Sequence, residues 1–159
     1  MPSKPPEWNI LTSTAEKCLE NLVYAYNYKQ NGIRYDSILS NSFEFYFDPQ
    51  DVQDISVPPF WQKQQEVSVL IDAQQQGVDA ESLFLSMSNI DGQNDNHNVT
   101  TVVFYRHYEL WVSDLGKIYK GKLQISVEKE SDGLWRIKRW YDYREGSEWT
   151  WGRMKYEYY

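Results

Sequence analysis

The apolar residues follow two periods along the chain, helical spacing up to about residue 80 and strict alternation after it. Ser13-Thr14-Ala15-Glu16 has the form of a capping box, in which Ser13 would begin a helix. Asn31-Gly32 is a turn signal, so we expect this helix to end near Lys29. Its apolar positions fall on one face: Ala15, Cys18, Leu19, Leu22, Val23 and Tyr26.

Three more elements are predicted before residue 80. Residues 33–40 form a short helix, and residues 42–47 alternate three Phe with Glu44 and Tyr46, which indicates a half-buried strand. Asp48-Pro49 ends that strand. A third helix is expected from Pro58-Pro59 to about Gln76, because Pro is tolerated in the first helical turn and Gly77 suits the position after the last.

The second part of the chain predicts four strands, at 81–90, 99–113, 117–130 and 134–143, joined by a loop at 91–98 and turns at 114–116 and 131–133. Gly121 inside the third of these suggests a bulge or a bend. In the last, Trp135 and Ile137 are expected to face the core, and a bulge would reverse the alternation beyond it. The pattern predicts an α+β fold, a curved antiparallel sheet wrapped over N-terminal helices, cone-shaped with an internal pocket.

Composition adds an unusual aromatic content. The 159 residues suggest one domain, and they include seven Trp, thirteen Tyr and six Phe. Most of these rings are expected in the core, and the rest could line a pocket or an interface. The single cysteine, Cys18, allows no internal disulfide and is expected to be a buried, inert thiol.

Charge and termini bear on partners and location. The net charge of −7 argues against a nucleic-acid-binding surface, since such surfaces are basic. No apolar run reaches membrane-spanning length, and we expect no transmembrane segment. The start "MPSKPPEW" suits a Pro-rich linker over residues 1–10, following an export signal or lipid anchor, or an ordinary frayed terminus. An exported or lipid-anchored, extracytoplasmic protein is the favoured expectation over a cytoplasmic one.

Three passages resemble the nuclear-transport-factor-2-like superfamily, which includes ketosteroid isomerase, scytalone dehydratase and the SnoaL-type polyketide cyclases. They are "AEKCLENLVYAYNYKQNGIRYDSILSNSFEFYF", Asp48-Pro49 after it, and "DGLWRIKRWYD" near the end. The resemblance assigns residues 11–145 to that domain and leaves 146–159 as an aromatic C-terminal extension. The fold hosts enzymes, binding proteins and scaffolds alike, so it does not choose among functions.

The pocket that the resemblance implies would hold a small apolar or aromatic molecule. The first expectation for function is therefore a non-catalytic small-ligand-binding or interaction domain, forming a homodimer through the open face of the sheet. The residues expected to line the pocket are aromatic: Tyr26, Phe45, Trp61, Tyr105, Trp135 and Trp140.

The alternative is a cofactor-free isomerase, dehydratase or cyclase. Asp48 matches the general base of the ketosteroid isomerases, but Leu22 stands where their first-helix Tyr donor would be, so Asp48 could equally cap a turn or helix. His107 could pair with Asp48 or Asp142 as a dehydratase-like dyad, or belong to a polar patch.

No cofactor or metal is expected. Residues 91–98, "DGQNDNHN", lack the glycine position and distal Glu of a calcium loop. Two distant histidines and one cysteine form no transition-metal cluster. In the tail, Trp149 alternates with Trp151 and Tyr156 with Tyr158, which allows an added edge strand, an aromatic patch for a partner, or packing against the protein's own sheet.

Overall fold

The computed structural model describes residues 7–76, 83–113 and 116–159, so the expected 1–10 linker and the 114–116 turn lie partly outside it, as does Gly77. The elements run in the order α1 (Ala15–Asn27), η1 (Lys29–Ile38), β1 (Leu39–Tyr46), α2 (Pro49–Ile55), β2 (Phe60–Gln62), α3 (Lys63–Gln76), β3 (Leu83–Asn89), β4 (Asn96–His97), β5 (Thr101–Val112), β6 (Lys117–Lys129), β7 (Trp135–Tyr143) and α4 (Trp151–Glu157).

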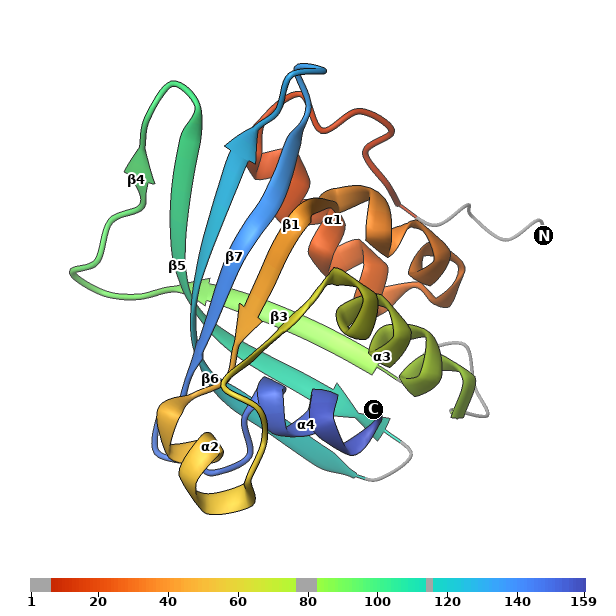
Figure 1. Ribbon diagram of the computed structural model, residues 1–159, viewed down its shortest axis with the longest axis vertical. Coiled ribbons are helices and arrows are strands. Elements are labelled where there is room, and N and C mark those ends of the chain that lie inside the picture. The colour runs from red at the N-terminus through yellow and green to blue at the C-terminus, as the bar shows by residue number, and fades with distance from the viewer. Residues whose placement is uncertain (1–6, 77–82, 114–115) are drawn as a thin grey trace.

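A curved seven-stranded sheet has the order β2-β1-β7-β6-β5-β3, with β4 paired to β5. Helices α1, α3 and α4 and the 3-10 helix η1 lie on its concave side (Figure 1). The predicted antiparallel pairs β5–β6 and β6–β7 are confirmed. The α+β class is confirmed too, but the sheet is mixed, because β1 and β7 run parallel.

Helix α1 buries the face that its pattern predicts, with Cys18 and Leu22 fully inaccessible to solvent. Its first residue differs from the capping-box prediction. Thr14 is the N-cap, since its side chain accepts a hydrogen bond from the Lys17 backbone N–H and its backbone is extended. Burial raises the pKa of the Cys18 thiol to about 12, which keeps it protonated and unreactive, as expected.

The segment around the prolines differs from prediction. Pro49 opens the short helix α2, with Asp48 as its N-cap, and this helix was not expected. Pro58-Pro59 does not open α3. Residues Phe60–Gln62 first pair with β1 as the edge strand β2, and α3 begins at Lys63. An edge strand can follow prolines because only one of its sides needs ladder donors.

A bulge in β7 sets which side chains enter the core. Val127 of β6 is opposite Ile137, whereas the preceding Ser126 is opposite Arg139, so Lys138 is the extra residue. Trp135 and Ile137 face inward before the bulge, and Trp140 and Asp142 face inward after it. The conditional reversal predicted from the alternation is therefore present.

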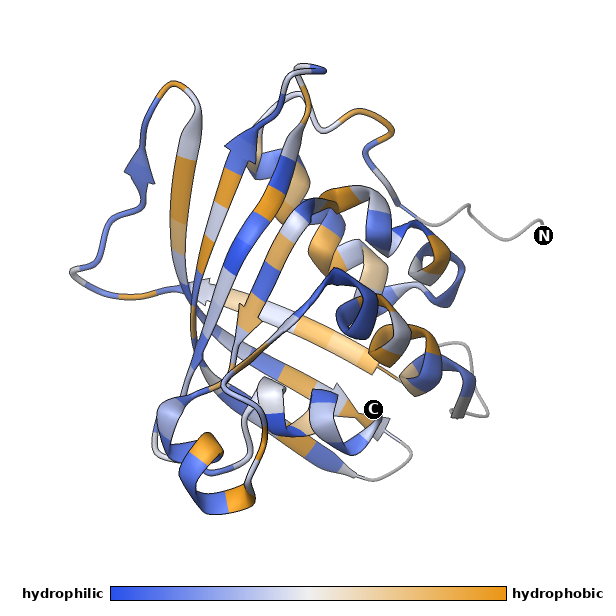
Figure 2. Cartoon of the chain, viewed as in Figure 1, coloured by the Kyte–Doolittle hydropathy of each residue, from blue (hydrophilic) through white to orange (hydrophobic). Residues whose placement is uncertain are grey.

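One core joins the helices to the sheet. Leu19, Leu22 and Trp135 belong to it, while Val23 packs at its margin. Apolar residues alternate with polar ones along β5, β6 and β7, as expected for strands with one buried face (Figure 2). Within the described residues, no helix is both long enough and apolar enough to cross a bilayer.

Candidate functional site: an aromatic chamber filled by the last helix

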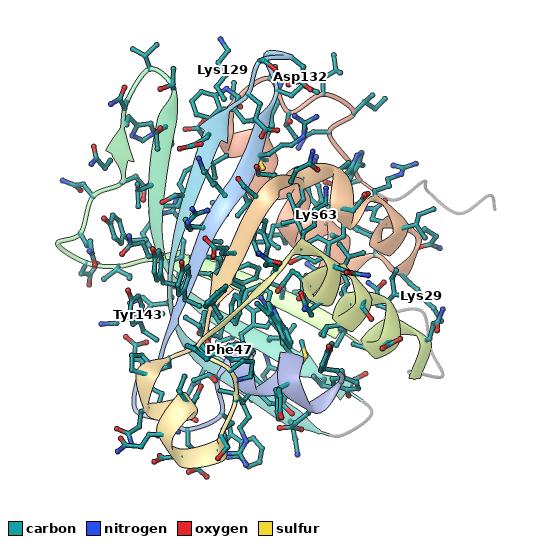
Figure 3. The ribbon with its side chains drawn as sticks, viewed as in Figure 1. Lys29, Phe47, Lys63, Lys129, Asp132 and Tyr143 are labelled. Atoms are coloured by element: carbon teal, nitrogen blue, oxygen red, sulfur yellow. The ribbon has the colours of Figure 1, made fainter. Side chains whose placement is uncertain are left out.

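Helix α4 lies inside the concavity of the sheet. Thr150 caps it by accepting from the Arg153 N–H, and its residues Trp151, Met154 and Lys155 are completely buried. Phe47, directly after β1, lies beside it (Figure 3). Of the three possibilities for the aromatic tail, the edge strand is wrong, and the tail packs against its own sheet as a helix.

The Lys155 ammonium meets a carboxylate held in place by aromatic residues. Its Nζ lies 2.5 Å from Glu66 Oε1, and both side chains have no solvent exposure. The hydroxyl of Tyr35 donates to Glu66 Oε1 at 2.9 Å, and the indole N–H of Trp61 donates to Oε2 at 2.9 Å. Glu66 is thus oriented by Tyr35 of η1 and Trp61 of β2 toward the α4 side chains. We call the region that α4 fills, bounded by Tyr26, Phe45, Trp61, Glu66 and Trp140, the aromatic chamber.

Aromatic faces surround the same ammonium. Nζ lies 3.3 Å from the ring centroid of Trp140 and 3.5 Å from that of Phe45. Such contacts are favourable because the ring face carries negative charge density. Burial lowers the pKa of Lys155 to about 8, and the Glu66 carboxylate opposes that shift.

The Trp151 indole fills the adjoining space. It packs edge-on against Trp140, with ring centroids 4.4 Å apart, and against Tyr26, 4.9 Å apart. Its Nε1–H donates to the Tyr26 hydroxyl at 3.1 Å. A buried indole therefore has both its apolar body and its polar N–H satisfied within the chamber.

Asp142 binds the first turn of α4 to the sheet. Its Oδ1 accepts from the Tyr108 hydroxyl at 2.5 Å and its Oδ2 accepts from the Gly152 N–H at 2.8 Å. The Trp151 N–H donates to the Tyr108 oxygen at 2.8 Å. Burial raises the pKa of Asp142 to about 7, although these hydrogen bonds and Lys155 act in the opposite direction.

The segment between β7 and α4 is fastened to α2. Arg144 contacts the buried carboxylate of Asp51 at 2.7 Å, and the Thr150 hydroxyl donates to the other Asp51 oxygen at 2.6 Å. The N-cap of α4 is therefore itself anchored. Together with Asp142, these contacts hold α4 at its N-terminal end, while Lys155 and Glu66 hold it further along.

Solved structures of other proteins share this architecture. A nuclear-transport-factor-2-like protein of unknown function from Pseudomonas putida KT2440 superposes with a TM-score of 0.61 at 5% identity, over 82% of this chain and 83% of that one. A nuclear-transport-factor-2-like protein from Anabaena variabilis gives 0.54 at 18% identity, over 91% and 98%. A domain of unknown function with a cystatin-like fold from Nostoc punctiforme gives 0.58 at 12% identity, over 88% and 78%.

The chain has the nuclear-transport-factor-2-like fold. The resemblance drawn from the sequence is confirmed at that level. No protein-family model and no curated protein matches the sequence. Because this fold hosts many functions, the function depends on the residues of the site and not on the fold.

Within the nuclear-transport-factor-2-like fold, four of the six residues expected to bind ligand surround the chamber: Tyr26, Phe45, Trp61 and Trp140. Trp135 is not among them. It lies five residues before Trp140 on β7, roughly 16 Å away along the strand, and its backbone N–H donates to Thr12 O. Tyr105 is only half-buried and points to the opposite face from its buried neighbour Phe104.

The sequence interpretation missed Glu66, Tyr35, Trp151 and Lys155. Trp151 and Lys155 are four residues apart, the spacing that places two side chains on one face of a helix. A helical interpretation of the tail would have paired them. The alternation of Trp149 with Trp151 favoured a strand instead.

The two candidate bases lie away from the chamber centre. Asp48 Oδ1 accepts from the Gln50 N–H and Oδ2 from the Arg144 N–H, each at 2.7 Å, so both oxygens serve the helix cap and the loop. The proposed pairing of His107 with Asp48 or Asp142 is wrong. His107 Nδ1 lies 2.8 Å from Glu145 Oε1, because β5 turns this side chain to the face opposite Tyr108.

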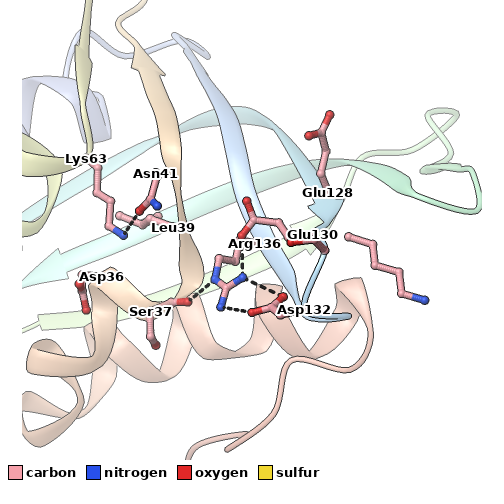
Figure 4. A pocket seen from close by; sticks show the side chains of 11 residues that line it. Asp36, Ser37, Leu39, Asn41, Lys63, Glu128, Glu130, Asp132 and Arg136 are labelled. Carbon is pink, nitrogen blue, oxygen red and sulfur yellow. Dashed lines mark hydrogen bonds and ion pairs between the residues drawn. The ribbon is translucent and has the colours of Figure 1, made fainter.

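A polar groove of about 740 Å³ lies where η1 and β1 approach the β6–β7 turn (Figure 4). Its most basic group, Arg136, is already bound by Asp132 at 2.8 Å and Glu130 at 2.6 Å, and it donates to Ser37 O. This charge is internally satisfied. In the part of the chain that the structure describes, no cluster of three or more His, Cys, Asp or Glu could hold a metal.

Proposed function

We propose that this chain is a small-ligand-binding domain and that its ligand site is the chamber now filled by α4. The observation that supports the proposal is that the residues surrounding the chamber belong to elements other than α4. Glu66, Phe45, Trp61 and Trp140 come from α3 and the sheet, and none comes from α4. The walls would remain if α4 moved, and concave aromatic surfaces with a few directed polar groups are typical of small-ligand sites.

Ligand entry then requires α4 to leave the chamber. The measured affinity would be lower than the intrinsic affinity by the fraction of molecules that are open. A variant that weakens the docking of α4 should therefore bind ligand more tightly than the native chain does, without any change in the chamber walls.

Gly152 offers such a variant. A Cβ added there would lie 2.9 Å from Asp142 Oδ2 and 3.0 Å from Phe47 Cδ1, so Gly152→Ala should push α4 away from the sheet. The matched control is Tyr156→Ala, on the exposed side of α4. The probe is N-phenyl-1-naphthylamine, whose fluorescence rises in apolar surroundings.

We expect Gly152→Ala to bind the probe saturably, and Tyr156→Ala to behave like the native chain. Trp61→Ala in the Gly152→Ala background should weaken binding. Absence of saturable binding to a folded Gly152→Ala chain, or binding insensitive to Trp61→Ala, would overturn the proposal.

A second candidate is general-base chemistry, as in a cofactor-free isomerase, dehydratase or cyclase. It rests on the His107–Glu145 contact, because a carboxylate at Nδ1 fixes the ring and leaves Nε2 to take a proton. The pair lines a groove of about 540 Å³ with Ser86 and Ser88. Turnover of enone isomerisation or dehydration substrates that His107→Ala abolishes, with Asp48→Asn as the comparison, would support it. No turnover above buffer would dismiss it.

We also propose a homodimer through the open face of the sheet. Phe84, Trp111 and Ile118 lie side by side there on β3, β5 and β6, and all are exposed. An apolar row beside an edge strand is a surface that a second copy could cover.

We also propose that the protein is exported. Fractionation of cells expressing the native gene tests this, and recovery of the protein only in the cytoplasmic fraction would contradict it.

A further inference from the structure

We infer that the chamber selects an arylalkylammonium cation, a flat aromatic group joined to an amine by a short chain, and that Trp151 and Lys155 occupy its two subsites. This inference rests on the proposed function and names the ligand class of the same site. It follows from two adjoining environments in the core, one around the Lys155 ammonium and one around the Trp151 ring.

The ammonium subsite is complete without α4. The Glu66 carboxylate is fully buried and is fixed by Tyr35 and Trp61, and the rings of Phe45 and Trp140 flank the Lys155 nitrogen at 3.5 and 3.3 Å. A buried carboxylate facing a space enclosed by ring faces is stabilised by any cation that enters. The same carboxylate would repel an anion.

The aromatic subsite adjoins it. Trp151 packs against Trp140 and Tyr26, and Tyr26 accepts its indole N–H. The Lys155 nitrogen lies 5.3 Å from the Trp151 ring centroid. A two-carbon chain between an indole and an amine spans a separation of this order, so one molecule of the tryptamine kind could reach both subsites.

The first experiment tests the ammonium subsite by chemical rescue in the full chain. Lys155→Ala removes the native cation and leaves a space beside Glu66. We expect n-butylammonium at millimolar concentration to raise the Tm of this variant by several degrees, and to leave the native chain and Lys155→Ala/Glu66→Gln unchanged. Equal rescue by 1-butanol, or none by either, would overturn the inference.

The second experiment keeps the inference testable if Lys155→Ala does not fold. In Gly152→Ala, titration calorimetry compares tryptamine, indole and indole-3-propionate. We expect tryptamine to bind roughly tenfold or more tightly than indole, and indole-3-propionate to bind least, because each carries the same ring but a different charge. Glu66→Gln in this background should remove the preference.

The outcomes separate the two proposals. If the three probes bind equally and N-phenyl-1-naphthylamine also binds, the chamber is a ligand site without cation selectivity, so this inference fails and the proposed function stands. If no probe binds a folded Gly152→Ala chain, both fail.

Discussion

Lys155 and Glu66 form an ion pair, with 2.5 Å between Nζ and Oε1, that has no solvent exposure on either side. It joins α4 to α3 in the protein interior. The carboxylate also receives hydrogen bonds from Tyr35 and Trp61, so removing the lysine would leave an oriented, buried negative charge. A buried charge without its partner is far more costly than an exposed one.

Lys155→Met should therefore reduce the free energy of unfolding by about 3–5 kcal/mol, measured by urea denaturation. Lys138→Met is the matched control, since Lys138 pairs with Glu128 at 2.9 Å with both side chains partly exposed, and its loss should cost less than about 1 kcal/mol. Glu66→Gln added to Lys155→Met should restore part of the stability. Equal small losses in both lysine variants would contradict a strong contribution from the buried pair.

The second prediction concerns pH. The pKa of Asp142 is raised from 3.8 to about 7 in the folded chain, so the folded state holds a proton that the unfolded state has lost. Stability should then fall as pH rises from about 4 to 7. The pKa of Lys155 is lowered from 10.5 to about 8, so stability should rise again between about pH 8 and 10.

Denaturation at a series of pH values should thus show a minimum near pH 7–8, with a depth of a few kcal/mol, at about 1.4 kcal/mol per pKa unit. Asp142→Asn should flatten the acidic side and Lys155→Met the basic side. A monotonic profile across this range would be inconsistent with a buried Asp142 and Lys155.

Gly121 gives the third prediction. A Cβ there would lie 2.4 Å from Tyr143 O and 2.7 Å from the Tyr108 hydroxyl, which itself binds Asp142. Gly121→Ala should cost about 1–3 kcal/mol through overpacking and should loosen α4. Gly92→Ala meets no atom within 4 Å but has φ +77°, so it controls for backbone strain alone, about 1–2 kcal/mol. Only Gly121→Ala should increase proteolysis of the C-terminal segment, and equal proteolysis of both variants would contradict the close approach.

The fourth prediction tests the core. Leu22 is fully buried, so Leu22→Ala should cost about 2–5 kcal/mol in thermal or urea unfolding. Val23, next in sequence, packs only at the core's margin, and Val23→Ala should cost clearly less. A loss below about 0.5 kcal/mol for Leu22→Ala would show that this face of α1 contributes little.

The regular elements were predictable because periodicity reports which face is buried. The pattern from Ala15 to Tyr26 located α1, and alternation located β5, β6 and β7. The parallel β1–β7 pair was not predictable, because pairing direction depends on the path of the chain between strands. Asp48 was recognised as a possible cap, but the α2 helix that it begins is too short for a periodic signal.

The chamber was half predictable. The alternation in residues 42–47 placed Phe45 on the buried face, whereas Trp140 faces inward only because of the bulge at Lys138. Glu66 and Lys155 were missed because charged residues are expected at the surface, and only three-dimensional placement shows each to be the other's partner.

The last prediction concerns association of two copies. Phe84, Trp111 and Ile118 are direct cross-strand neighbours, with exposed fractions of 57%, 45% and 38%, on the outer face beside the edge strand β3. Cross-strand neighbours present their side chains to the same face, so the three form one apolar row.

The native chain should sediment as a dimer at high micromolar concentration. Trp111→Lys should give a folded monomer, because a charge at the centre of the row would be desolvated on association. Val99→Lys, at an exposed apolar residue outside the row, should leave the dimer intact. A native monomer, or a Trp111→Lys dimer of native affinity, would show that this face is not where the copies meet.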